Sequence, residues 1–302
     1  MAQALSNLSI TLLDQGRGRE ALEYLKEAKQ QETLLTETTL GSITTDTTLS
    51  TTHLKLDQYT QALAYAHQAR ETAEAMQSPV LYVVLVRLAK LYRILGATQE
   101  AKDYFDAARV LPRASEHLAD TLFREYAVFL LEQGENASEI TAQALHSLNQ
   151  TEHLYGWYKT HLELLSHVES DEQMQIIDQT LTKPALHTMK GLHILALTRG
   201  AQLQLELGKV KKALEFSQQA IALLVDYDPD LQRAEVLLTH YRALEANNHK
   251  NTKPFLEQTL HWLLEIANHV PAEYRTSFLT RNPINRQILE LARLKGLEIN
   301  DL

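Results

Sequence analysis

The stretch LGKVKKALEFSQQAIALL, residues 207–224, contains a glycine followed by two alanines that are seven residues apart. The glycine is Gly208, the alanines are Ala213 and Ala220, and large side chains such as Phe216 stand between them. Residues seven apart share one face of a helix, so the alanines mark a face where a second helix can approach to about 8–10 Å. Glycine suits the turn before this helix, because it adopts positive φ at little cost.

The same pattern occurs four times along the chain. Gly16, Asp57, Gly96 and Gly208 each stand five residues before an alanine, and a second alanine follows seven residues later. The alanine pairs are Ala21 and Ala28, Ala62 and Ala69, Ala101 and Ala108, and Ala213 and Ala220. An apolar helical stripe precedes each turn, so each copy predicts a helix–turn–helix unit. One such unit cannot bury its apolar face alone, and the units are therefore expected to stack. A plain bundle with accidental alanines fits the joint spacing less well.

The composition agrees with a helical, folded chain. Hydrophobic residues make up 44% of the 302 residues and charged residues 22%, with only 10 glycines and 7 prolines to interrupt helices. The net charge of −9 argues against direct nucleic-acid binding, which needs a basic surface. The absence of cysteine excludes disulfides and thiolate chemistry. No signal-peptide core or run of 18 apolar residues occurs, so we expect a cytoplasmic protein without a membrane partner.

These units resemble the tetratricopeptide repeat (TPR) family. The best match consists of Leu85, Leu88, Ala89, Tyr92, Gly96, Ala101, Phe105 and Ala108. The resemblance implies an all-α, right-handed superhelical solenoid of about seven helix pairs, with the repeat array over residues 1–270. The spacings of 41 residues from Ala21 to Ala62 and 39 from Ala62 to Ala101 exceed the usual repeat of about 34, which implies longer helices.

Residues 271–302 depart from the repeat pattern and are expected to form a C-terminal cap. PAEYRTSFLTRNPINRQILELAR, residues 271–293, resembles the end of the repeat arrays in bacterial MalT-like and AfsR-like signal-transduction ATPases and transcription regulators. A terminal element should cover the last repeat with its apolar side chains, here Phe278, Leu279, Ile288 and Leu289. Asn282 should cap the closing helix. The chain begins mid-pattern, and we expect it to be a fragment or a free-standing relative of a larger regulator.

Motifs that would indicate catalysis or a cofactor are lacking. DYDPD, residues 226–230, alternates carboxylates like a calcium loop, but Leu231 and Leu237 stand where that loop needs Gly and Glu. The thirteen histidines include no His-x-x-x-His pair, and neither a phosphate-binding loop nor a nucleophile elbow occurs. We therefore expect no enzyme activity, no cofactor and no metal.

In the resembled family, the first helix of each pair lines a concave groove, and positions i, i+3, i+7 and i+10 of that helix are exposed. Carried over to this chain, the candidate ligand-binding residues are Thr44, Thr47, Thr51, Lys90, Arg93, Arg124, Tyr158, His161 and Gln202. The threonines belong to a run of ten within residues 33–52, which is either a hydroxyl-lined groove or a close-packed or loose segment. Lys90, Arg93 and Arg124 form either a basic spot for an anionic partner or ordinary surface charge.

The function that follows is a non-catalytic binding module. The resemblance implies the sensor or scaffold part of a bacterial signalling or transcription regulator, which holds a peptide, a protein or a small effector in its groove. The alternative is a free-standing TPR adaptor that assembles two proteins.

Overall fold

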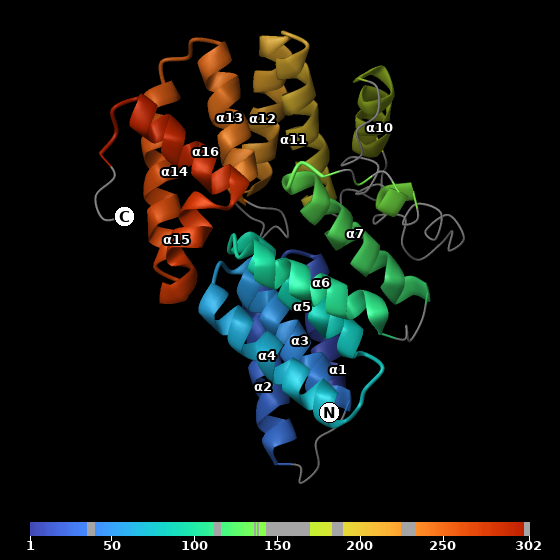
Figure 1. The fold of residues 1–302 in the computed structure, drawn as a ribbon. Helices are drawn as coiled ribbons and strands as arrows, with labels where there is room; N and C mark the ends of the chain where they lie inside the picture. The colour runs from blue at the N-terminus through green and yellow to red at the C-terminus, as the bar shows by residue number, and fades with distance from the viewer. Residues whose placement is uncertain are drawn as a thin grey trace.

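The computed structural model describes residues 1–34, 40–111, 116–135, 137, 139–142, 170–182, 190–224 and 233–298. These residues form helices and turns and contain no strand (Figure 1). The helices are α1 (Ala2–Asp14), α2 (Gly18–Thr33), α3 (Leu40–Lys55), α4 (Tyr59–Ala75), α5 (Leu81–Ile94), α6 (Thr98–Val110), α7 (Glu116–Glu132), α10 (Ser170–Thr182), α11 (Lys190–Glu206), α12 (Val210–Leu224), α13 (Arg233–Ala246), α14 (Thr252–Ala267), α15 (Ala272–Thr280) and α16 (Pro283–Leu294).

Consecutive helices form hairpins in which small side chains lie at the crossings. The closest pairs are α1 with α2, α3 with α4, α5 with α6, and α11 with α12. All eight alanines of the repeated pattern are at most 1% exposed. Large side chains fill the space beside the crossing, as Phe105 does at 0% exposure. The predicted role of the alanine pairs is confirmed.

One turn geometry ends the first helix of each hairpin. After α5, for example, Gly96 N–H donates to Arg93 O at 3.1 Å and Ala97 N–H donates to Tyr92 O at 2.9 Å. This pattern closes a helix through a residue with positive φ. The residues in that position are Gly16, Asp57, Gly96, Gly134, Gly208 and Asn248. Asp57 at φ 56° and Asn248 at φ 50° show that short polar side chains can replace glycine there.

The hairpins stack into a solenoid because each first helix packs on the pair before it. Helix α3 contacts α2 and α1, helix α5 contacts α4 and α3, and helix α13 contacts α12 and α11. The expected all-α superhelical repeat array is thus confirmed.

The C-terminal hairpin of α15 and α16 packs on the last repeat, which consists of α13 and α14. Helix α16 contacts α14 and α13, in the place that the first helix of a further repeat would occupy. Phe278, Leu279, Ile288 and Leu289 are all at most 2% exposed. Asn282 caps α16, since its side-chain oxygen accepts from Ile284 N and Asn285 N, both at 3.1 Å.

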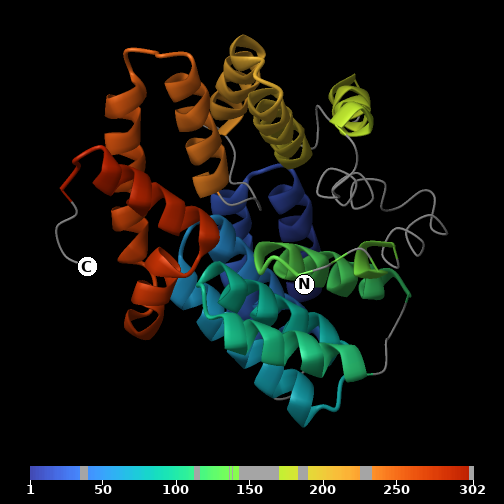
Figure 2. The same cartoon turned by 45° about the horizontal axis from the view of Figure 1, so that its top comes forward.

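The same hairpin also reaches back to the second and third repeats, which the sequence did not lead us to expect. Figures 1 and 2 both show α15 beside the end of the array that contains α4 to α6. Hydrogen bonds at 2.8–3.2 Å join residues in helices and turns that are about 180–210 residues apart in the chain. We call this contact the seam and define it by Thr60, Ile94, Leu95 and Gly96 on one side and by His269, Ser277 and Asn282 on the other.

Aromatic side chains border the seam. The rings of Tyr59 and Phe278 have centroids 5.3 Å apart, and those of Tyr92 and Tyr274 are 5.4 Å apart in an edge-to-face arrangement. These residues belong to the largest hydrophobic core, which therefore includes side chains from both halves of the chain.

Candidate ligand-binding site

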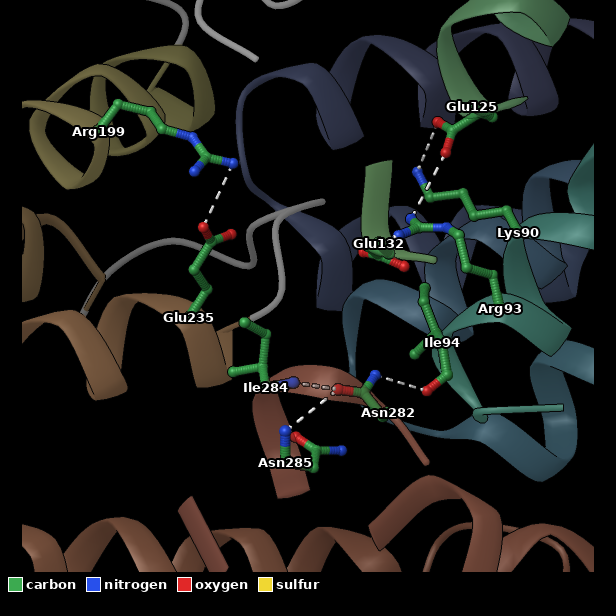
Figure 3. A network of polar contacts seen from close by, with 10 residues as sticks. All are labelled: Lys90, Arg93, Ile94, Glu125, Glu132, Arg199, Glu235, Asn282, Ile284 and Asn285. Carbon is green, nitrogen blue, oxygen red and sulfur yellow. Dashed lines mark hydrogen bonds and ion pairs between the residues drawn. The ribbon is translucent and has the colours of Figure 1, made fainter. Parts of the chain in front are cut away.

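The structure brings the three predicted basic residues together around two acids between α5 and α7. We call this group, Lys90, Arg93, Arg124, Glu125 and Glu132, the α5–α7 cluster. Glu125 lies at its centre, 3.2 Å from Lys90 Nζ, 3.6 Å from an Arg93 nitrogen and 2.7 Å from an Arg124 nitrogen. Arg93 also pairs with Glu132 at 2.5 Å (Figure 3). The basic spot is therefore an ion network and not an array of isolated cations.

These cations are buried, so the expectation that they are exposed is wrong. Lys90 and Arg124 are 6% exposed and Arg93 is 8% exposed. A buried charge is costly unless an opposite charge lies close to it, and Glu125 and Glu132 meet this need. Burial raises the pKa of Glu132, while Arg93 lowers it and the carboxylates of Glu235 and Glu125 raise it further.

A second polar group, which we call the α11–α13 cluster, surrounds Gln202. The oxygen of the Gln202 amide accepts from Arg199 at 2.8 Å. Its nitrogen donates to Glu235 at 3.1 Å and to Thr239 at 3.0 Å. Arg199 and Glu235 also form an ion pair at 3.4 Å. Gln202 is thus held by partners on two helices, and both of its polar atoms are satisfied.

The two clusters lie near each other although they come from distant parts of the chain. Glu235 contributes to the raised pKa of Glu132, which places the two carboxylates within electrostatic reach. Figure 3 shows the Arg199–Glu235 pair facing the side chains of Arg93 and Glu132. We call the side of α5, α7, α11 and α13 that bears these clusters the inner face. Several first helices of the array therefore carry charged and amide groups to one region.

The predicted threonines lie half-buried on α3 and use their hydroxyl protons within the helix. Thr44, Thr47 and Thr51 donate to the carbonyl oxygens four residues earlier, at 3.2, 2.7 and 2.9 Å. A hydroxyl that has donated in this way offers only lone pairs to a ligand. Thr48 and Thr52 make the same bond but are buried. The threonine run therefore combines a packed face with a face of hydrogen-bond acceptors.

Two of the predicted site residues, Tyr158 and His161, lie outside the described residues. Sequence reasoning also missed five members of the clusters, namely Glu125, Glu132, Arg199, Glu235 and Thr239. The adjacency of Arg124 and Glu125 was an available signal for the first of them. Pairing across α5, α7, α11 and α13 depends on how the repeats stack, and no local pattern encodes it. Among the described residues, no group of three His, Asp or Glu side chains could hold a metal ion.

Comparison with known proteins agrees with a TPR-like array. Residues 1–30 match the model of the Tetratricopeptide repeat family, which covers α1 and most of α2. None of the curated proteins matches the chain in sequence. No helix in the described ranges is both long enough and apolar enough to cross a membrane.

Solved structures resemble the chain over nearly all of its length, among them two Rap proteins. One is the Rap conjugation gene regulator of the plasmid pLS20 in complex with the Phr* peptide, with a TM-score of 0.59, 11% identity, and coverage of 99% of this chain and 98% of that chain. The other is a Rap protein complexed with Competence and Sporulation Factor, with a TM-score of 0.54, 14% identity, and coverage of 96% and 98%. At these identities the likeness shows the fold.

Proposed function

We propose that the chain is a non-catalytic module that binds a peptide or protein on its inner face, as the sensor or scaffold part of a bacterial signalling or transcription regulator. The resemblance of residues 271–293 to the ends of MalT-like and AfsR-like arrays supports the regulatory setting. The pLS20 Rap regulator, which has a similar fold, was solved with a peptide, and this supports the ligand class.

The observation that carries the proposal is the concentration of buried charge on the inner face. In the α5–α7 cluster, Lys90, Arg93, Arg124 and Glu125 are 4–8% exposed. The side chain of the fifth member, Glu132, is 21% exposed. Replacing a buried ion network by apolar side chains is often neutral or stabilising, so stability alone gives little reason to keep one. A polar ligand gives such a reason, because its own charged and amide groups could exchange with the existing partners.

The amide of Gln202 is the best-placed single recognition group. It is half-buried, it carries one donor group and one acceptor, and its partners already hold it in one orientation. Both amide protons are already donated to Glu235 and Thr239, but the carbonyl oxygen, which accepts one bond from Arg199, has a second lone pair. This pre-oriented oxygen can accept a hydrogen bond from a peptide N–H without a further loss of side-chain freedom. Thr44, Thr47 and Thr51 would then accept hydrogen bonds from ligand N–H groups.

A selection of binders from a random peptide library tests the proposal. The dissociation constant of a selected peptide is measured by calorimetry for the parent and for Gln202→Ala and Arg93→Gln. We expect each variant to bind at least about tenfold more weakly, a loss of about 1.4 kcal/mol. The control is Arg286→Gln, an exposed residue of α16. Failure to select any peptide, or equal affinity in the parent and both variants, would overturn the proposal.

A further inference from the structure

The seam joins two parts of the array through turns and helix ends. On one side are the start of α4 and the end of α5, and on the other are the α14–α15 turn, Ser277 in α15 and the α15–α16 turn. Thr60 donates from its backbone nitrogen and from its hydroxyl to His269 O, at 3.2 and 3.0 Å. No helix from α3 to α6 packs extensively against one from α14 to α16. The seam is thus a local contact that can part without separating any helical hairpin.

The fit at the end of α5 is specific. The last carbonyls of a helix have no partner within the helix and must be satisfied by other groups. Here Ser277 Oγ donates to Leu95 O at 2.8 Å and Asn282 Nδ2 donates to Ile94 O at 2.9 Å. Gly96 lets the chains approach, because a Cβ at this position would collide with the backbone oxygen of Ser277. The C-terminal hairpin therefore recognises the end of α5 by shape and by hydrogen bonds.

The helix that the seam holds also carries part of the inner face. Arg93 precedes Ile94 directly, and Lys90 lies one helical turn earlier. Figure 3 shows the Asn282–Ile94 bond beside the Arg93 side chain. Lys90 and Arg93 are at most 8% exposed, because they pack against Glu125 and Glu132 of α7. The Arg199–Glu235 pair lies opposite them, so a ligand as large as a peptide reaches them only when the two clusters move apart.

We propose that the α15–α16 hairpin is a latch, which closes the array by holding the end of α5 and which must release it before a ligand reaches the inner face. This inference rests on the proposed function for the identity of the ligand, and it adds how access to that site is controlled. Neutral hydrogen bonds, two aromatic contacts and the part of the core that contains Tyr59 and Phe278 hold the latch. The latch requires that this closed state exchange with a less populated open state.

The chain contains no cysteine, which permits a direct distance measurement across the seam. Spin labels are attached to Gln99→Cys on α6 and Thr280→Cys on α15, both exposed positions, and their separation is measured by pulsed electron paramagnetic resonance. With the seam residues unchanged, the doubly labelled protein should give one short distance between the two labels. Ser277→Ala combined with Asn282→Ala should add a population at longer distance, while Thr276→Ala, an exposed neighbour in α15, should leave the distribution unchanged.

The reactivity of Lys90 tests whether the latch controls access. The rate of Lys90 acetylation is followed by mass spectrometry in the unlabelled parent, in Ser277→Ala alone, in the double variant and in Thr276→Ala. We expect the double variant to react about tenfold faster, which corresponds to the loss of two neutral hydrogen bonds. Circular dichroism establishes that each variant is folded, and Ser277→Ala keeps the Asn282 cap of α16 intact.

Two results would overturn the latch. One is a single short distance in folded variants that lack the seam bonds, and the other is a longer distance without a change in Lys90 reactivity. Neither result depends on a ligand, so the latch can fail while the peptide-binding measurements succeed. In the same way, absence of peptide binding would leave the distance and acetylation results unaffected.

Discussion

The turn at Gly96 and the turn at Gly208 have the same backbone but different surroundings. Both glycines have φ of +67°, and both end a first helix with the same pair of backbone hydrogen bonds. A Cβ on Gly208 would meet nothing within 4 Å, whereas one on Gly96 would collide with Ser277 and lie 2.8 Å from Asn282 N. The repeated sequence therefore dictates the turn, and a partner about 180 residues away decides whether that turn tolerates a side chain.

The largest expected difference in the free energy of unfolding is between the variants Gly96→Ala and Gly208→Ala. Gly208→Ala should lower the free energy of unfolding by about 1 kcal/mol, the cost of left-handed φ for a residue with a Cβ. Gly96→Ala carries that cost and a backbone collision, so we expect a loss of about 3 kcal/mol or more. Urea unfolding of both variants measures the two values. Equal losses would show that the seam does not form in solution.

Two asparagines give a second matched pair. Asn282 caps α16 and bonds Ile94 O across the seam, whereas Asn247 Nδ2 donates at 2.7 Å to Val210 O within one pair of neighbouring repeats. Asn282→Ala should cost about 2–3 kcal/mol, from the lost cap and a carbonyl left unsatisfied. Asn247→Ala should cost about 1 kcal/mol. Chemical denaturation ranks the two, and a reversed order would contradict the seam contact.

The sequence predicted the hairpins well because their determinants are local. Ala101 and Ala213 are both 0% exposed, and each predicted turn glycine has positive φ. These features depend on residues within about ten positions of one another. The seam depends on the summed curvature of the whole array, which brings Ser277 to Leu95. No sequence periodicity encodes this summed curvature. The sequence therefore predicts that residues 271–302 cap the last repeat, but it does not predict their contact with α4 and α5.

Each of the two regions contains a histidine that should make the free energy of unfolding depend on acid pH. His67 lies near the seam, 2.9 Å from the hydroxyl of Tyr92, and His240 lies 2.9 Å from Ser217 Oγ between α12 and α13. Burial lowers the pKa of His67, with a further contribution from Arg70 opposed by Glu71. Burial also lowers the pKa of His240, to about 4, and His249 contributes.

A histidine with a lowered pKa binds its proton more readily in the unfolded chain, so its contribution to stability is present above pH 6.5 and is lost as the pH falls toward 4. The free energy of unfolding, compared between each variant and the parent at pH 7 and pH 4.5, isolates this effect. His240→Gln should remove about 2 kcal/mol of the acid destabilisation, and His67→Gln should remove less. An unchanged pH dependence in both variants would show that neither imidazole is desolvated.

The smallest expected effect comes from the turn after α13. Asn248 adopts φ of 50° and is exposed, at a turn position where Gly16, Gly96, Gly134 and Gly208 stand in other repeats and Asp57 stands in one. Asn248→Gly relieves the left-handed strain but adds freedom to the unfolded chain, so we expect a gain of no more than about 0.5–1 kcal/mol. Thermal unfolding measures the change. A clear loss of stability would mean that the Asn248 side chain has a role that the turn geometry does not explain.

The candidate site could be predicted in part. Lys90, Arg93 and Arg124 occupy equivalent faces of first helices in the repeat spacing, which left open whether they form a basic spot or ordinary surface charge. The structure brings them together around Glu125. Their burial was not foreseen, because it depends on carboxylates of α7: Glu125 and Glu132 neutralise Lys90 and Arg93 of α5, and Glu125 also pairs with its neighbour Arg124. Gln202 was assigned to the groove, but its partners Glu235 and Thr239 depend on the register of α13 against α11.

The most direct test of the closed array is a disulfide across the seam. Thr60→Cys combined with His269→Cys joins positions already linked by hydrogen bonds at 3.0 and 3.2 Å. The control combines Thr60→Cys with Lys209→Cys, beside the open turn at Gly208. Mass spectrometry and non-reducing gels should show a rapid intramolecular disulfide in the first pair and none in the control. Free thiols or only intermolecular disulfides in the first pair would contradict the closed array.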